Sequence, residues 1–517
     1  MRPSTASRRL ALALALALPP AVPAVAQGAP ADTRNALPSL GDSADEGLTV
    51  SAERRLGDRI MRELRRDADY LDDPVLLDYL ARMWDGLVVA ARARGDVPPE
   101  LAERFAWEPF LVRDRSVNAF ALPGGYIGVH LGLVAVTATP DELASVLAHE
   151  LSHVSQRHIA RSVDAGKATS FAGIAGMILG VLVASRSPEA AQALITGGQA
   201  VAVQGQLNFS RDMEREADRV GFGVLTGAGY APGGMSAMFE KLLQAARLND
   251  SQNFPYLRSH PLTTERIGEA RSRLGVDGAA PPPRTLVYAL MQARARVLMD
   301  PRDAALQRAQ DFDRTVAAVS GAPLERAAAL YTSALASILR RDAARADAAI
   351  AAARPLVDGD AAARQLLDLL ALQGLIERGD AAAAAALLER AALPEARPTL
   401  LARGQVALLP GAAAADQRRA AERLQTWVAL HGADALAWGQ LAQLWSRLGE
   451  PLRSVRAEAE ARAAVGDVVG AIERLRAGQR LARSARSSEG VEATVIDARL
   501  RELERLRREI VEEERRG

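Results

Sequence analysis

The feature that most restricts how this chain can fold is a metal-binding pattern of the form H-E-x-x-H at residues 149–153. It lies within residues 141–159, where apolar side chains recur at the spacing of an amphipathic helix. Positions i and i+4 of a helix lie roughly 40° apart, so His149 and His153 can both reach one metal ion. Glu150 projects beside them, where it can hold a metal-bound water and take its proton. The fold has to bury this helix and bring a further ligand to it from another element.

A second polar cluster at residues 210–218 contains two acids at helical spacing, Glu214 and Asp218. A catalytic zinc ion takes three protein ligands and keeps one open position. With Glu214 as the third ligand, Asp218 one turn later would accept the outer N–H of a ligand histidine and fix its tautomer. Arginines alternate with these acids, and from the spacing alone an ordinary exposed charged helix is an equally good interpretation.

The two clusters together resemble those of the HtpX/BepA-type metallopeptidases, most closely the periplasmic BepA branch. The resemblance is carried by residues 149–153 (H-E-L-S-H) and 210–221 (S-R-D-M-E-R-E-A-D-R-V-G), and residues 53–78, 118–127 and 258–261 are also similar. It covers roughly residues 45–275 strongly and the remainder of the chain weakly.

This resemblance implies a zinc-dependent endopeptidase with one zinc ion per chain. The family's ligands are its two motif histidines and the glutamate four residues before the aspartate, which carry over to His149, His153 and Glu214. Glu150 carries over as the general base, and Asp218 as the acid behind the ligands. 

The family also implies a strand-turn-strand unit ahead of the zinc helix. A substrate peptide is expected to lie extended along the edge strand, because main-chain pairing tolerates many sequences and suits unfolded chains. The residues expected to bind it are Asn118, Ala119, Phe120 and Ala121.

The expected fold is mainly α: a zincin-like α+β metalloprotease domain with a small sheet, followed by an all-α tetratricopeptide-like helical repeat domain. The expected divisions are a signal peptide at 1–26, a linker at 27–48, the protease domain at 49–277, a proline-rich linker at 278–285 and the repeat domain at 286–517. Proline density in the second linker is too high for a helix or a central strand.

The N-terminus has the three parts of a secretory signal peptide. Arg2, Arg8 and Arg9 form the charged region, residues 10–18 the apolar region, and residues 24–26 (A-V-A) a small-residue cleavage site. The apolar region is far shorter than the ~20 residues of a membrane span. The absence of cysteine suits an oxidising compartment. We therefore expect export to the periplasm.

One uncharged run, residues 171–184, contains Gly176 and Gly180 at a spacing that allows close helix packing. Its 14 residues are too few for an ordinary span. A buried helix or a mobile lid is one interpretation, and peripheral membrane contact is the other.

The C-terminal half has alanine- and leucine-rich helical periodicity interrupted by short glycine-acid turns. Two of these turns, at residues 379–380 and 449–450, are separated by close to two tetratricopeptide periods of ~34 residues. The turn at 466–467 falls out of this period, so an irregular helical bundle is the alternative.

Among the remaining histidines, His260 precedes a proline and is expected in a loop. It could donate to a tetrahedral oxyanion, occupy the open metal position and keep the enzyme latent, or cap a backbone group. His158, five residues after His153, would point about 140° away from it on a continuous helix. Neither it nor His130 and His431 is expected to bind the metal.

Charge gives no sign of a nucleic-acid partner, since 64 Lys and Arg against 63 Asp and Glu leave a net charge of +1. The expected function is periplasmic proteolysis of misfolded or unassembled envelope proteins, with the repeat domain docking clients or the outer-membrane assembly machinery. The alternative is a repeat-based periplasmic chaperone or assembly adaptor with a latent protease. An integral membrane protease is disfavoured, because no long apolar run follows the signal peptide.

Overall fold

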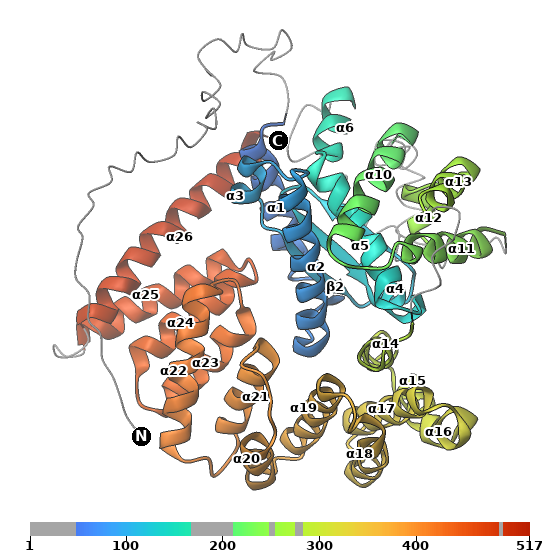
Figure 1. The fold of residues 1–517 in the computed structure, drawn as a ribbon. Helices are drawn as coiled ribbons and strands as arrows, with labels where there is room; N and C mark the ends of the chain where they lie inside the picture. Colours follow the sequence, from blue (N-terminus) through green and yellow to red (C-terminus); the bar gives the residue numbers. More distant parts are fainter. Residues whose placement is uncertain (1–47, 167–209, 248–253, 275–282, 485–489, 517) are drawn as a thin grey trace, which may run out of the picture. The chain divides into compact units, whose positions relative to one another are not determined.

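The computed structural model describes residues 48–166, 210–247, 254–274, 283–484 and 490–516 (Figure 1). The expected signal peptide and the uncharged run at 171–184 therefore lie outside the described residues. Within the described ranges, no helix combines the length and apolar character needed to cross a membrane.

A small four-stranded sheet with the order β1-β2-β4-β3 forms one part of the N-terminal half. Its strands are β1 (Tyr70–Leu71), β2 (Glu108–Val112), β3 (Ala119–Leu122) and β4 (Tyr126–His130). β2 and β4 are parallel, whereas the other two pairs are antiparallel, and β3 is an edge strand. Gly124 and Gly125 join β3 to β4 with φ of 78° and 88°, a conformation that other residues rarely adopt. The expected strand-turn-strand unit is present.

Ten described helices accompany the sheet. They are α1 (Val50–Leu64), α2 (Pro74–Arg94), α3 (Pro99–Arg104), α4 (Leu131–Val136), α5 (Pro140–Ser155), α6 (His158–Gly166), α10 (Arg211–Gly227), α11 (Gly233–Arg247), α12 (Tyr256–Ser259) and α13 (Thr264–Ser272). The central one is α5, which packs against α2, α10, α11 and β3. Thr139 caps its first turn by accepting a hydrogen bond from the Glu142 amide, and every residue from Glu142 to Ser155 is buried. Polar side chains on α5 therefore lie inside the protein.

The expected helix over residues 141–159 is shorter than predicted. α5 ends at Ser155, and Arg157 takes the left-handed conformation with φ of 52° before α6 begins at His158. The Arg157 guanidinium donates to the buried carboxylate of Glu53 at 3.0 Å, which holds the break in place. Because the helix is interrupted, the direction predicted for His158 from helical geometry is wrong.

In the C-terminal half, the regular structure over the described residues 283–484 and 490–516 is helical. Its elements are α14 (Leu286–Leu298), α15 (Asp303–Gln310), η2 (Asp311–Arg314), α16 (Val316–Ser320), α17 (Pro323–Leu339), α18 (Ala343–Val357), α19 (Ala361–Glu377), α20 (Ala381–Arg390), α21 (Arg397–Ala407), α22 (Ala414–Leu430), α23 (Ala435–Arg447), α24 (Pro451–Ala464), α25 (Val468–Ser484) and α26 (Gly490–Arg516). From α17 to α26 each helix packs against the next one along the chain. At the turn 379–380, Gly379 is left-handed and Asp380 caps α20, as the glycine-acid pattern predicts. The expected combination of an α+β domain and a helical domain is confirmed, while the tetratricopeptide assignment and the domain boundaries stay predictions.

Two neighbouring aspartates at the start of α2 bind arginines of the C-terminal half. Arg294 of α14 donates twice to Asp73, at 2.7 Å each, and its side chain is buried. Arg397 of α21 donates twice to Asp72, also at 2.7 Å, and again to Asp434. The hydrophobic core likewise runs from α5 through α14 to α17 without a break. The two halves are therefore joined by buried contacts and not only by the linker.

We predict that Arg294→Met lowers the free energy of unfolding by about 3–5 kcal/mol, because it leaves the Asp73 carboxylate buried without its cation. Asp73→Asn in the same chain should recover part of this loss, since asparagine removes the charge and can still cap α2. Arg296→Met, on the exposed side of α14, is the matched control. Thermal or urea unfolding measures all three variants. Equal midpoints for the Arg294 and Arg296 variants would contradict the prediction.

Candidate metal centre

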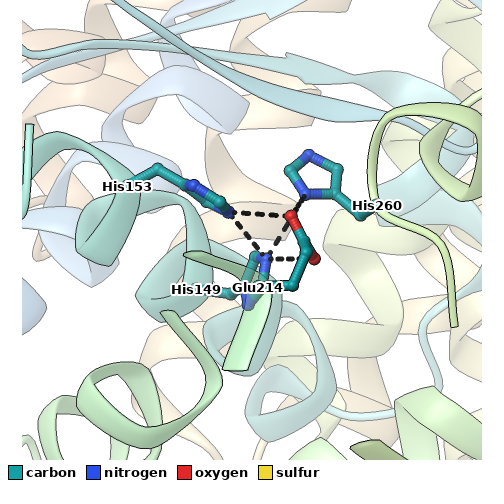
Figure 2. A group of neighbouring side chains, drawn as sticks. All are labelled: His149, His153, Glu214 and His260. Atoms are coloured by element: carbon teal, nitrogen blue, oxygen red, sulfur yellow. Dashed lines mark hydrogen bonds and ion pairs between the residues drawn. The ribbon is translucent and has the colours of Figure 1, made fainter. Parts of the chain in front are cut away.

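Four buried side chains converge in the N-terminal half: His149, His153, Glu214 and His260 (Figure 2). One ligating atom from each lies within 4.8 Å of all the others. The first two come from α5, the third from α10, and the fourth from the residue that follows α12. The structure thus brings together the three predicted metal ligands and the loop histidine.

Close packing of α10 on α5 places the acids beside the histidines. A Cβ atom at Gly221 would lie 3.0 Å from the Ala148 carbonyl oxygen and 3.1 Å from the His149 amide nitrogen, so only glycine fits without displacing backbone. Ser210 caps the start of α10 by accepting from the Met213 amide. As a result Glu214 and Asp218, one helical turn apart, are both buried against α5.

The separations between the donor atoms fit one tetrahedral metal ion. His153 Nε2 lies 3.0 Å from His149 Nε2 and 3.4 Å from Glu214 Oε1. His260 Nδ1 lies 3.4 Å from His149 Nε2 and 2.9 Å from Glu214 Oε1. Metal–donor bonds of about 2.0–2.1 Å place the donors of a tetrahedral ion about 3.3 Å apart. Three imidazole nitrogens and a carboxylate oxygen are also ligand types that zinc accepts.

Buried carboxylates make this centre favour positive charge. Burial opposes the ionisation of Glu214, but the charge of His260 and hydrogen bonds from His149 and His260 hold the pKa of that carboxyl well below its usual range. Burial likewise opposes ionisation of Asp218, yet hydrogen bonds from Arg266 and His149 lower its pKa. Burial lowers the pKa of His149, but hydrogen bonds to Asp218 and Glu214 outweigh it and raise the pKa to about 9. A cation bound between these groups would be stabilised.

Glu150 joins the metal cluster to the edge of the sheet. Its Oε2 accepts a hydrogen bond from the Ala121 amide of β3 at 3.1 Å, and its Oε1 lies 3.5 Å from His260 Nε2. The side chain is fully buried, and that burial raises the pKa of the carboxyl. Glu150 therefore lies where the H-E-x-x-H pattern predicts a base, next to the strand predicted to bind substrate.

Arg266 of α13 is a site residue that sequence reasoning missed. Its Nε and Nη2 donate to Asp218 at 2.6 and 2.9 Å, and its Nη1 lies 2.8 Å from Glu214 Oε2. Nη1 also donates to the Pro261 carbonyl at 2.9 Å, directly after His260. The available signal was indirect: if the two acids lie buried together, as the metal-site interpretation requires, they need a nearby cation.

His260 lies at the end of α12 with its ring stacked on Tyr256, the centroids 4.5 Å apart. Its position inside the cluster favours a role at the metal over the capping role that the sequence left open. His158 is not one of the four converging residues, and it faces His153 instead of pointing away from it, because α5 ends early. His130 binds Ser116 Oγ at 3.0 Å, and His431 stacks on Trp427.

We predict that Arg266→Met lowers the thermal unfolding midpoint by more in a chelator than with zinc added. The reason is that Glu214 and Asp218 lose their buried cation, and a bound metal ion compensates only part of that loss. The thermal midpoint of Arg266→Lys should fall between those of the wild type and Arg266→Met, because lysine keeps the charge but cannot donate to Asp218 with two parallel N–H groups. Arg271→Met, an exposed change on the same helix, is the control. If Arg266→Met and Arg271→Met have the same thermal unfolding midpoint in chelator, Arg266 is not the cation that stabilises the two buried acids.

Comparison with known proteins places this centre within a described family of peptidases. Residues 87–274 match the model of Peptidase family M48. The β-barrel assembly-enhancing protease of Escherichia coli (strain K12) is 36% identical over 251 residues, which cover 48% of this chain and 50% of the relative. The protein of the same name from Yersinia pestis is 34% identical over 262 residues, covering 51% of each.

A shorter relative, the metalloprotease LoiP of Escherichia coli (strain K12), is 32% identical over 164 residues, which cover 32% of this chain and 61% of that protein. The chain spans about half the length of the β-barrel assembly-enhancing proteases that it matches. The matched region includes all four side chains of the metal cluster. Residues 87–274 of the chain are therefore a peptidase family M48 domain, as the resemblance of its motifs implied.

Proposed function

We propose that the chain is a periplasmic zinc-dependent endopeptidase that degrades misfolded or unassembled envelope proteins. The observation that carries this proposal is the buried cluster of His149, His153 and Glu214 with Glu150 beside it. A scaffold protein has no need of two histidines, a carboxylate ligand and an adjacent buried base in this arrangement. The family match and the names of the relatives support the same activity.

One zinc ion per chain would be held by His149, His153 and Glu214, and zinc in such a site acidifies water and polarises a peptide carbonyl. Glu150 would accept the proton of the attacking water and return it to the leaving amine. Burial raises the pKa of the Glu150 carboxyl, and a raised pKa favours uptake of a proton by this group. Asp218 would hold the His149 ring through Nδ1, which lies 2.9 Å from the carboxylate.

The proposed substrate site is the edge of β3 that pairs with no strand among the described residues, with Asn118, Ala119, Phe120 and Ala121 contributing to it. β3 pairs with β4 on one side, and backbone groups of alternate residues in an edge strand point outward. The Ala121 amide, which donates to Glu150, is one of these groups. Asn118 Oδ1 is buried and has no hydrogen-bond partner among the described residues, so it can accept from a substrate N–H.

For His260 we propose the gating role. Its Nδ1 lies close to His149 Nε2 and Glu214 Oε1, so the ring occupies the corner of the donor set that a catalytic site leaves open for water. Stacking on Tyr256 and the bond from Arg266 to the Pro261 carbonyl favour this arrangement. A protease in this state would be latent until the residues around His260 move.

The helical half would then dock clients or the outer-membrane assembly machinery. Support for this comes from its helix-on-helix packing and from relatives named β-barrel assembly-enhancing proteases. The signal-peptide pattern, although outside the described residues, supports export to the periplasm. The proposed blocking of the fourth metal position by His260 also supports a second candidate function, a repeat-based chaperone or assembly adaptor with a latent protease.

Glu150→Gln should retain about one zinc ion per chain and lose peptidase activity by about 100-fold or more, because glutamine cannot take up the proton. Its amide oxygen can still accept from Ala121, so the strand and helix should keep their positions. Zinc content by atomic absorption and digestion of casein measure the two effects. Casein digestion at the wild-type rate would show that Glu150 is not the base.

His260→Ala should raise basal casein digestion if the ring blocks the open position. A fall in the rate with unchanged zinc content would instead assign His260 to stabilising the oxyanion. His431→Ala, which removes a histidine far along the chain in a stacked contact with Trp427, is the control. If the His260 and His431 variants both match the wild type in rate and zinc affinity, His260 has neither role.

A further inference from the structure

The two motif histidines differ in what holds their outer nitrogen atoms. Both direct Nε2 toward the ligand cluster, which leaves Nδ1 on the outer side of each ring. His149 Nδ1 faces a carboxylate, Asp218 Oδ1, at 2.9 Å. His153 Nδ1 faces another imidazole, His158 Nδ1, at 2.8 Å. The usual partner of a ligand histidine is a carboxylate, a backbone carbonyl or water, so this contact calls for an explanation.

A carboxylate is reached one side chain further out. The other ring nitrogen of His158, Nε2, lies 3.0 Å from Glu216 Oε2. The same oxygen of Glu216 accepts from Arg161 at 2.8 Å. His158 is fully buried, whereas the Glu216 side chain is 28% exposed. His153, His158 and Glu216 therefore form a continuous chain of contacts from the ligand cluster toward the surface.

Only one arrangement of protons satisfies this chain when His153 binds a metal through Nε2. The proton of His153 is then on Nδ1, which donates to His158 Nδ1. His158 must accept at Nδ1, so its own proton is on Nε2, where it donates to the Glu216 carboxylate. Each of the two contacts thus has one donor and one acceptor, and the tautomer of each ring is determined by its neighbour.

We propose that His158 and Glu216 are positioning residues that fix the tautomer and the orientation of the metal ligand His153. The inference rests on the proposed metal site. The break between α5 and α6 makes it possible, because on a continuous helix His158 would point away from His153. Helix α10 then supplies three acids around the two motif histidines: Glu214 as ligand, Asp218 behind His149, and Glu216 behind His153 through His158.

The test compares zinc affinity, by competition with a chelating dye, across four variants of the full chain. His158→Ala should lower the affinity by about 10–100-fold, the usual effect of removing an outer partner of a ligand. His158→Asn should recover most of the loss, because its Oδ1 takes roughly the place of Nδ1 and can accept from His153. Glu216→Ala should cause a smaller loss than His158→Ala. Arg215→Ala, which removes an exposed neighbour on α10, should match the wild type.

Two further readouts separate positioning from a merely structural role. The visible absorption bands of the cobalt-substituted protein report the ligand geometry, and they should shift in His158→Ala and return in His158→Asn. With peptide substrate, kcat should fall in His158→Ala while KM stays near its wild-type value. The thermal unfolding midpoint of the metal-free protein should change little in Glu216→Ala, because the Glu216 side chain is partly exposed.

Wild-type zinc affinity in both His158→Ala and Glu216→Ala would overturn the inference, and so would a His158→Asn variant that is no better than His158→Ala. If His158→Ala does not fold, the zinc affinity of Glu216→Ala decides. Weaker zinc binding by Glu216→Ala supports the positioning role of His158 and Glu216, and unchanged binding refutes it. A wild-type chain that binds no zinc would overturn both the proposed function and the positioning role. A wild-type chain that binds zinc, with the same zinc affinity in all four variants, would overturn the positioning role alone.

Discussion

The packing of α10 against α5 is the contact on which the rest of the site depends. Gly221 lets the two helices approach until backbone meets backbone, and that approach buries Glu214 and Asp218 beside His149. Two carboxylates in a buried position are costly unless cations face them. Arg266 supplies one such cation permanently, and the histidine cluster provides a place for a second. The affinity of the centre for a metal ion thus follows from how closely two helices pack.

The parts of the site that lie on single helices were predictable from the sequence. His149, Glu150 and His153 share a helix, and Glu214 and Asp218 share another, so residue spacing alone states which side chains lie together. The meeting of the two helices was not predictable from spacing, and the family resemblance supplied it. The prediction of a helical half succeeded for the same reason, since left-handed glycines and aspartate caps are local signals, whereas the strand-turn-strand unit was implied by the family resemblance.

Residues whose partners come from distant elements were missed. Arg266 lies 48 positions from Asp218 along the chain, and no periodic pattern connects them. The predicted orientation of His158 assumed a continuous helix, but that helix ends at Ser155. The break at Arg157, which is left-handed, was not predicted because no glycine or proline marks it in the sequence. The proline content that predicted the linker likewise gave no information on Arg294 and Arg397, whose ion pairs join the two halves.

Arg266 also offers a physical route for the gating that we propose for His260. Its guanidinium bonds Glu214 and Asp218, which hold the metal side of the site, and through Nη1 it bonds the Pro261 carbonyl next to His260. The bonds to Asp218 are charge-assisted and paired, whereas the bond to Pro261 is a single bond to a neutral carbonyl, so it is the weaker of the two. Displacement of His260 can therefore break the Pro261 bond and the Tyr256 stack while the carboxylates keep their cation. The ligand geometry would survive an opening that frees the fourth position, which is what a reversible switch at this site requires.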